Sequence, residues 1–198
     1  FKSTPQAVGG VRWSTAAAGI KNSALASSSP DVALMEIAAG SNVAGVFTLN
    51  AFAAAPVIVA KRHLALLQNK TSSGPIFCLI NSGNANAGTG AAGLVAADTS
   101  CQSVSEQFAG EQHSVLPFST GVIGESLAVQ KINNVMPALA DSLSEAAWDE
   151  AARAIMTTDT VPKIGSCELE IDGQSVVLTG IAKGAGMIKP NMATMLAF

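Results

Sequence analysis

The chain of 198 residues is long enough for one large domain or two small ones. Its 11 Lys and Arg against 14 Asp and Glu give a formal net charge of −3 without a basic run, which argues against a nucleic-acid-binding surface. The most apolar window, residues 35–60, is interrupted by polar residues and a proline, which argues against a membrane span.

Charged residues are scarce, at 13% of the chain against about 25% in a typical globular protein. Mean hydropathy is correspondingly high, at +0.37. Since charged side chains usually cover the solvated surface, we expect another polypeptide to cover part of this one, either as an oligomer partner or as a second half. A surface rich in alanine and glycine that needs no partner is the alternative.

Cysteine and histidine are too few and too scattered for a zinc site or a disulfide framework. Cys78, Cys101 and Cys167 lie far apart in apolar patterns, and His63 and His113 are the only histidines. We therefore expect buried free thiols in a reducing compartment. The cytoplasm is the expected location, with the mitochondrial matrix as the alternative.

The first half of the chain alternates strands with one helix. A turn at Gly9-Gly10 leads into a first strand. The pattern then predicts strands over residues 32–37 and 43–49, a helix over 55–67, and a short buried strand over 75–80.

The second half contains the clearest helix, over residues 91–109, because apolar residues recur there at spacings of three and four. The pattern predicts a brief strand over 114–117, a helix over 129–143, a helix capped by Ser144 and running to Ile155, and a hairpin turning at Asp172-Gly173. Mixed elements without a strict βαβ rhythm predict a layered α/β (α+β) sandwich.

A polar, glycine-rich loop, NSGNANAGTG at residues 81–90, lies between a predicted strand and a predicted helix. That position resembles a phosphate-binding loop. The sequence matches neither GxGxxG nor GxxxxGK[ST], however. We interpret it as a shaped loop near a site, with nucleotide binding as the weaker alternative.

Three further segments carry groups that suit acyl transfer. Thr120 and Gly121 follow a strand and offer a hydroxyl and an N–H to a developing oxyanion, although a plain turn is the alternative. Thr157 belongs to a cluster of hydroxyls with Asp159 that suits an amino-acid substrate, or that ends a helix. Lys183 opens a glycine-rich turn and suits a substrate carboxylate, or is a solvated surface lysine.

The last phrase, KGAGMIKPNMATMLAF, places the small Ala193 directly before Thr194. A threonine hydroxyl is a poor nucleophile without an adjacent base. If Thr194 becomes the first residue of a chain, its own α-amino group, with a pKa of about 7.7–8.0, supplies that base. The alternative interpretation is an ordinary threonine at the start of a buried strand.

Four phrases in order and register resemble the ornithine acetyltransferase family, the glutamate N-acetyltransferases of arginine biosynthesis. They are NSGNANAGTG, FSTGVIGE, AIMTTDTVPK and IAKGAGMIKPNMATMLAF, and AAGIK and GVFTLN extend the likeness toward the N-terminus. Gly88 departs from the pattern, because many relatives have cysteine there.

The resemblance implies an α-β-β-α sandwich of a precursor that cuts itself between Ala193 and Thr194. Residues 1–193 would form the alpha chain, and residues 194–198 would begin the beta chain. It also implies that Thr120 and Gly121 form the oxyanion hole and that Thr157, Lys183 and Thr194 bind substrate. The beta chain would supply further substrate-binding groups, in a hetero-oligomer of two alpha and two beta chains.

The activity that the resemblance implies is transfer of the acetyl group from N2-acetylornithine to glutamate through an acetyl-threonine at Thr194. No metal or organic cofactor is expected, and acetyl-CoA is a second acetyl donor only if the protein is bifunctional. Two alternatives stay open from the residues alone. One is a self-processing N-terminal-threonine aminopeptidase or amidase, and the other is a non-catalytic ligand-binding protein.

Overall fold

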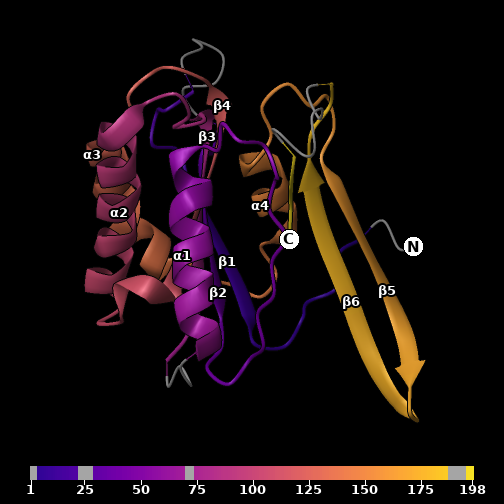
Figure 1. Cartoon of the computed structure of the whole chain (residues 1–198). Helices are drawn as coiled ribbons and strands as arrows, with labels where there is room; N and C mark the ends of the chain where they lie inside the picture. Colours follow the sequence, from indigo (N-terminus) through magenta and orange to yellow (C-terminus); the bar gives the residue numbers. More distant parts are fainter. Residues whose placement is uncertain (1–3, 22–28, 70–73, 187–194) are drawn as a thin grey trace.

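The computed structural model describes residues 4–21, 29–69, 74–186 and 195–198. Two sheets and four α-helices make up this part of the chain (Figure 1). The first region contains β1 (Val11–Ala16), β2 (Val32–Ile37), α1 (Ala55–Asn69), β3 (Ile76–Asn84), α2 (Gly90–Gln107), a 3₁₀ turn η1 (Gln112–Ser114), β4 (Val115–Val122), α3 (Val129–Asp141) and α4 (Trp148–Ala154). The second sheet contains β5 (Lys163–Ile171), β6 (Gln174–Lys183) and β7 (Leu196–Ala197).

The first sheet has the order β1-β2-β3-β4, with β3 and β4 parallel and the other pairs antiparallel. Its central strand β3 begins with the apolar run Ile76–Ile80, buried on both faces as expected for a strand covered on both sides. Side chains alternate across that strand. Phe77 and Leu79 pack toward one core, and Cys78 and Ile80 pack toward the other.

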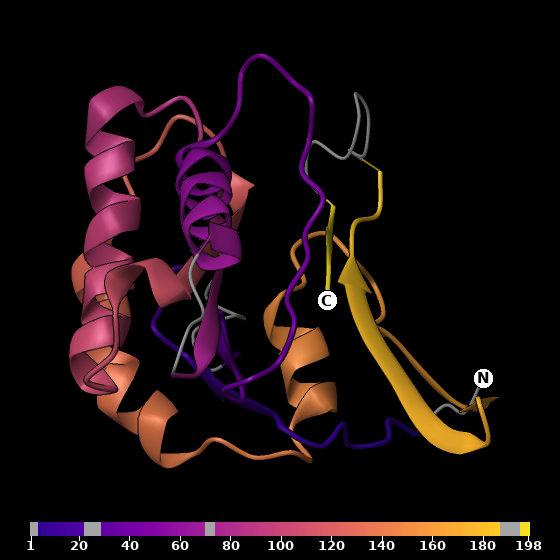
Figure 2. The same cartoon turned by 60° about the horizontal axis from the view of Figure 1, so that its bottom comes forward.

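Helices α1, α2 and α3 cover one face of this sheet, and α4 with the second sheet covers the other (Figure 2). The second core is built around Trp13, whose ring meets that of Trp148 in α4 at 5.5 Å between centroids. Ile181 of β6 belongs to the same core. The mixed α/β class is confirmed, with α4 in contact with strands of both sheets (Figure 1).

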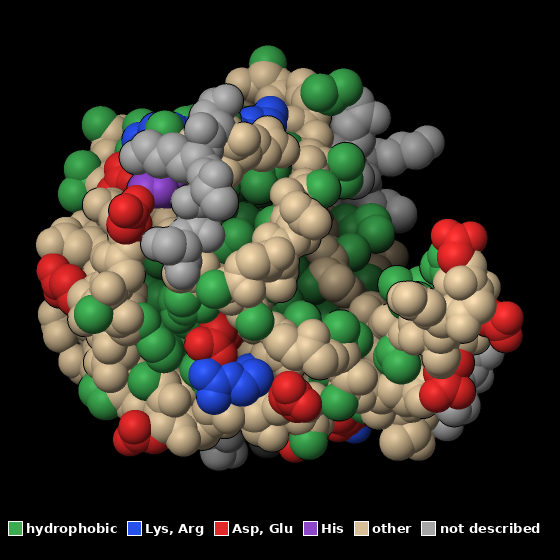
Figure 3. All heavy atoms as spheres, turned by 90° about the horizontal axis from the view of Figure 1, so that it is seen from below, with side chains coloured by type: hydrophobic (Ala, Val, Ile, Leu, Met, Phe, Trp, Pro, Cys, Tyr) green, Lys and Arg blue, Asp and Glu red, His purple; other side chains and the backbone are tan. Residues whose placement is uncertain are grey.

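The β5–β6 hairpin extends from the body of the molecule, with Asp172-Gly173 turning the chain as predicted. Register places Cys167 opposite Leu178 and Leu169 opposite Val176, so these side chains share one face with Ile171. We call these five residues the hairpin face. Its members are exposed or half-buried, with Leu178 57% exposed, and hydrophobic side chains reach the surface in this region beside acidic ones (Figure 3).

The strand expected over residues 43–49 is wrong. Residues 38–54, all of them described, contain no strand. Val43 and Phe47 pack against the core, whereas Val46 is 86% exposed and Leu49 is 84% exposed, so the inward-facing side chains do not alternate through to the end of this segment. The segment runs past α1 without pairing to a neighbouring strand, and extended backbone becomes a strand only through such pairing.

Other boundaries also differ from the prediction. The helix expected from Ser144 begins at Trp148, because the Ser144 backbone instead exchanges two hydrogen bonds of 2.9 Å with Trp13 at the edge of β1. Strand β3 continues through the polar residues to Asn84, and β4 continues to Val122. Thr120 and Gly121 therefore lie within a strand, which overturns the alternative of a plain turn.

Candidate active site

The polar segment at residues 81–90, which ends β3 and leads into α2, forms a framework of internal hydrogen bonds. Asn84 Nδ2 donates to the carbonyls of Glu125 (3.1 Å) and Ser126 (3.2 Å). Asn86 is fully buried, donates to Gly93 O at 2.9 Å and accepts from the Thr89 hydroxyl. The side-chain amides of Asn84 and Asn86 thus form hydrogen bonds with other protein groups, and these bonds fix the path of the chain from β3 into α2.

Gly121 brings β4 unusually close to β3. Its φ is +136°, and a Cβ at this position would lie 2.3 Å from the carbonyl carbon of Gly83 and 2.6 Å from Asn84 N. Only glycine fits this contact, since both the backbone angle and the space exclude a side chain. The close approach sets the position of Thr120, which pairs in register with Ser82.

Lys183 joins two threonines that are distant in sequence. Its Nζ donates to Thr157 Oγ1 at 2.8 Å and to Thr120 Oγ1 at 3.1 Å. Lys183 is 3% exposed and Thr120 is 2% exposed. Because an ammonium only donates, each hydroxyl accepts from Lys183 and keeps its own hydrogen to donate elsewhere. The structure therefore brings together three of the residues that the sequence predicts for the site.

Asp159 supplies the negative charge beside this lysine. Its Oδ2 lies 3.9 Å from Lys183 Nζ, and its Oδ1 accepts from the Gly184 backbone N–H at 2.9 Å and from the Lys163 ammonium. Burial alone would raise the pKa of the Asp159 carboxyl. The hydrogen bonds from Lys163, Gly184 and the Thr157 backbone N–H outweigh burial and hold that pKa below its ordinary value.

Burial lowers the pKa of Lys183 below its ordinary value. Asp159 opposes this shift by stabilising the ammonium, and Lys163 adds to it by like-charge repulsion. The two lysines and one carboxylate leave a net positive charge beside the two hydroxyls. The arrangement thus suits a small anion that also accepts hydrogen bonds, such as a carboxylate.

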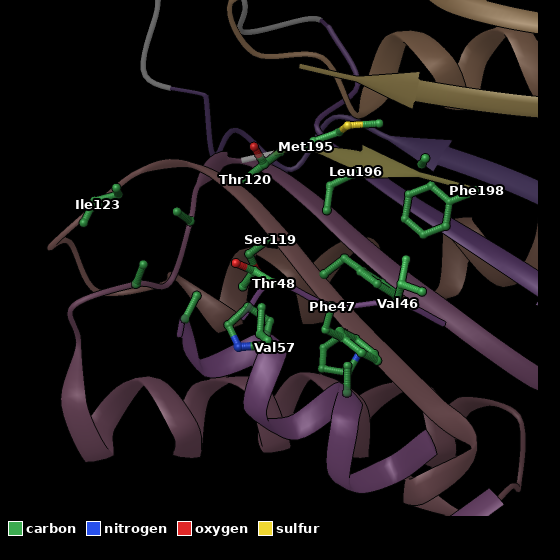
Figure 4. A pocket seen from close by; sticks show the side chains of 18 residues that line it. Val46, Phe47, Thr48, Val57, Ser119, Thr120, Ile123, Met195, Leu196 and Phe198 are labelled. Atoms are coloured by element: carbon green, nitrogen blue, oxygen red, sulfur yellow. The ribbon is translucent and has the colours of Figure 1, made fainter. Parts of the chain in front are cut away.

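A pocket of about 140 Å³ opens beside Thr120. Figure 4 shows its labelled side chains, with Thr120 and Met195 at the same end and Phe47 and Phe198 farther along. Ala85 and Ala87 of the polar loop also line it, so this loop lies near the site as predicted. The walls combine apolar side chains with the hydroxyls of residues 48, 119 and 120.

The last described residues are fixed against Lys183. Leu196 pairs with Lys183 across β7 and β6, and Phe198 exchanges two backbone hydrogen bonds of 2.9 Å with Ile181. The Phe198 ring also packs edge-on against Phe118 at 5.0 Å between centroids. Met195, which is bonded to Thr194 in the sequence, lines the same pocket as Thr120.

The predicted cleavage site, Ala193 and Thr194, lies outside the described residues. Within the described ranges, no cluster of three or more His, Cys, Asp and Glu side chains is placed to hold a metal ion. No helix in those ranges has the length and hydropathy needed to cross a membrane.

The sequence prediction included Asp159 in the polar cluster with Thr157 but gave it no individual role, and it did not single out Lys163. The sequence signal for this ion pair was the spacing of four residues between Asp159 and Lys163, which meet at the start of β5. The polar cluster at residues 157–160 was open to interpretation as a helix end. The contact between Asp159 Oδ1 and the Gly184 N–H joins segments 25 residues apart, and no local pattern announces it.

The two-sheet α/β fold places a buried ammonium and two hydroxyls beside a pocket, an arrangement that suits the anion stabilisation on which acyl-transfer enzymes depend. The chain belongs to the ArgJ family, whose sequence model matches residues 12–198.

Relatives with known names support this assignment. The chain is 53% identical over 191 residues to the arginine biosynthesis bifunctional protein ArgJ of Methylococcus capsulatus and 50% identical to that of Pseudomonas fluorescens. Each match covers 96% of this chain and 44% of the relative, so the chain spans less than half the length of these relatives.

Two solved structures share the fold over 93% of this chain at 34% identity. One is the arginine biosynthesis bifunctional protein of Bacillus halodurans, with a TM-score of 0.78 over 92% of that chain. The other is the ornithine acetyltransferase of Mycobacterium tuberculosis complexed with ornithine, with a TM-score of 0.80 over 93% of that chain.

Proposed function

We propose that this chain is the N-terminal part of a self-cleaving acetyltransferase that moves the acetyl group of N2-acetylornithine to glutamate in arginine biosynthesis. The observation that carries the proposal is the meeting of Thr120, Thr157 and Lys183 beside the pocket that Met195 lines. The names of the relatives support the pathway, and the ornithine complex of a structural neighbour supports the substrate class.

Self-cleavage is the first proposed step. The Thr194 hydroxyl attacks the carbonyl carbon of Ala193, the peptide C–N bond breaks, and an ester forms with the nitrogen left as the α-amine of Thr194. Water then hydrolyses the ester, giving a chain that ends at Ala193 and a second chain that begins at Thr194. This step supplies the base that the hydroxyl needs, because the new amine has a pKa near neutral pH.

Acetyl transfer follows in two halves. The α-amine of Thr194 accepts the proton of its own hydroxyl, the oxygen attacks the acetyl carbonyl of N2-acetylornithine, and ornithine leaves with that proton on its amine. The amine of glutamate then attacks the acetyl carbonyl of the acetyl-threonine, the ester C–O bond breaks, the α-amine of Thr194 passes a proton from the attacking amine to the Thr194 oxygen, and N-acetylglutamate leaves. The Thr120 hydroxyl and the Gly121 N–H donate to the oxyanion in both halves. These steps require no metal or organic cofactor.

Lys183 and Thr157 are the proposed substrate-binding groups of this chain. Both substrates carry a carboxylate, and the Lys183 ammonium is already directed at the two hydroxyls that flank it. Burial strengthens the attraction between this ammonium and an arriving carboxylate, because water screens it less. The same site then accepts acetylornithine and glutamate in turn.

The proposed partner is the C-terminal chain of the same precursor, in an assembly of two alpha and two beta chains. The hairpin face is an apolar surface that suits such a partner, and the named relatives are more than twice as long as this chain. Leu178→Glu should weaken retention of the second chain on size-exclusion chromatography. Ser175→Glu, also exposed but on the opposite side of β6, is the matched control and should not. The buried thiols of Cys78 and Cys101 suit the cytoplasm as its proposed compartment.

The decisive experiment compares the full-length precursor with its Thr194→Ala and Thr194→Ser variants. Intact mass should give two chains for the wild type, a single chain for Thr194→Ala, and slower cleavage for Thr194→Ser, which keeps a hydroxyl. Incubation with acetyl-labelled N2-acetylornithine and acid trapping should place the label on the Thr194 peptide. An unbroken wild-type chain would favour the non-catalytic alternative, and transfer of the label to water in preference to glutamate would favour the amidase.

The word "bifunctional" in the names of the relatives favours a second acetyl donor, for which acetyl-CoA is the proposed compound. The expected result is release of free CoA when acetyl-CoA and glutamate are supplied without acetylornithine. A wild-type enzyme that transfers acetyl groups only from acetylornithine would restrict the proposal to the first activity.

A further inference from the structure

The Asp159 carboxylate is fully buried and contacts three segments that build the site. Its Oδ1 accepts from the Gly184 N–H at the end of β6 and from the Lys163 ammonium at the start of β5. Its Oδ2 lies 3.9 Å from Lys183 Nζ and 3.5 Å from the Thr157 backbone N. One carboxylate therefore ties together the segments that present the substrate-binding lysine and threonine.

We propose that Asp159 is a positioning residue that holds the Lys183 ammonium against Thr120 and Thr157, and that Lys163 tunes the charge of this pair. The inference rests on the proposed function, because it concerns how Lys183 is made ready for a substrate carboxylate. Neither Asp159 nor Lys163 is assigned a contact with the substrate.

Burial of the Lys183 ammonium carries a free-energy cost. A buried ammonium is strongly disfavoured unless a counter-charge and hydrogen bonds compensate it. The Thr120 and Thr157 hydroxyls accept hydrogen bonds from Lys183 but are neutral, so the counter-charge comes from Asp159. Without this carboxylate, the Lys183 ammonium would lose its proton more readily and would hold a substrate carboxylate less well.

Asp159 also positions the site through the backbone N–H groups that donate to its carboxylate. Gly184 directly follows Lys183, so the hydrogen bond from its N–H to Asp159 fixes the backbone at the base of the lysine side chain. The contact with the Thr157 backbone N fixes the segment that carries the Thr157 hydroxyl. A neutral side chain at position 159 would accept weaker hydrogen bonds from Gly184 and Thr157 and would hold both segments less firmly.

Lys163 has the opposite effect on Lys183. It pairs with Asp159 through a side chain that is 44% exposed, and its charge lowers the pKa of Lys183. On the neighbouring strands, β4 presents the Thr120 hydroxyl and β7 presents Leu196, and both of these side chains are uncharged. Among the described residues, Asp159 raises the pKa of Lys183 and Lys163 lowers it, so these two charges act on its protonation in opposite directions.

The test uses the mature two-chain enzyme with Asp159→Asn, Lys163→Met and the control Asp149→Asn. Asp149 lies on α4 and forms an exposed ion pair with Arg153, so its substitution removes a carboxylate that takes no part in the contacts described for Asp159. The measurement is kcat/KM for N2-acetylornithine as a function of pH, with KM and kcat determined separately. Deprotonation of Lys183 is expected to produce the fall at basic pH, because the neutral amine loses its attraction for the carboxylate.

Asp159→Asn should lower kcat/KM by about tenfold, mainly through KM, and should move the basic limb to lower pH. Lys163→Met should move the same limb to higher pH, because it removes the charge that repels the Lys183 proton. Asp149→Asn should match the wild type. A merely structural role for Asp159 does not predict opposite movements of one limb.

Coincident pH profiles for the wild type and Asp159→Asn, or a Lys163→Met limb at lower pH, would overturn the inference. If Asp159→Asn does not mature into two chains, the direction of the Lys163→Met shift alone decides. A wild-type enzyme that transfers no acetyl group would overturn the proposed function together with this inference. An active wild type with unshifted variants would overturn this inference alone.

Discussion

Replacement of Gly121 by alanine tests whether the close contact between β3 and β4 is as tight as described. Alanine at a φ of +136° should cost about 1–3 kcal/mol through backbone strain. The new Cβ would also lie 2.3 Å from the Gly83 carbonyl carbon, and overpacking of this kind costs about a further 1–3 kcal/mol. The total loss in the free energy of unfolding should therefore be about 2–6 kcal/mol.

Gly124 provides a matched control for this variant. Its φ is also positive, at +84°, but a Cβ at Gly124 would meet nothing within 4 Å. Gly124→Ala should thus show only the backbone cost, about 1–3 kcal/mol. Urea unfolding of the full-length precursor, with Thr194→Ala present throughout to prevent cleavage, measures both. Equal urea midpoints for the two variants would refute the described contact with Gly83.

Three further results are expected. Iodoacetamide at pH 8 should alkylate the half-buried Cys167 in residues 1–198 alone but not in the full-length protein, where the second chain should cover it. Cys78 and Cys101 should stay unlabelled, because burial raises the pKa of each thiol to about 12. Peptide mass spectrometry that found these two cysteines labelled in the native state would contradict their burial. The free energy of unfolding of the wild type should rise as pH rises toward 10.5, because burial lowers the pKa of Lys183 and the unfolded chain therefore binds more protons than the folded chain in this range. Urea unfolding across pH should show no such rise for Lys183→Met. Parallel curves of unfolding free energy against pH for the two proteins would contradict the lowered pKa of Lys183. Trp13→Ala should lower the free energy of unfolding by about 3–5 kcal/mol, since the ring is fully buried against Trp148; a loss below about 1 kcal/mol would show that this core is not as packed as described.

The elements that the sequence predicted well are those whose signal is local. The helix expected over residues 91–109 corresponds to α2, and the hairpin turn at Asp172-Gly173 lies where it was expected. The segment at residues 43–49 failed because a strand also depends on a neighbour that local alternation does not reveal. The start of α4 failed for a similar reason, since the backbone of Ser144 is engaged by β1.

The site shows the same division. The sequence phrases indicated Thr120, Thr157 and Lys183 one by one, and the structure brings them within hydrogen-bonding distance although Thr120 and Thr157 lie 63 and 26 residues from Lys183. The Asp159 carboxylate escaped assignment because its partners come from three segments, and only the folded chain places Gly184 against it. The roles of Thr194 and Ala193 stay predictions, since both lie outside the described residues.

The pairing of β7 with β6 has a consequence for any product of cleavage. Leu196 and Ala197 pair with β6, the strand that carries Lys183, and the Phe198 ring packs against aromatic rings from β1 and β4. Hydrolysis before residue 194 would leave these interstrand hydrogen bonds intact, so cleavage of the backbone would not by itself detach residues 196–198 from β6. Residues 196–198 would still hold the second chain to β6, and the two chains would separate only after the pairing of β7 with β6 is broken.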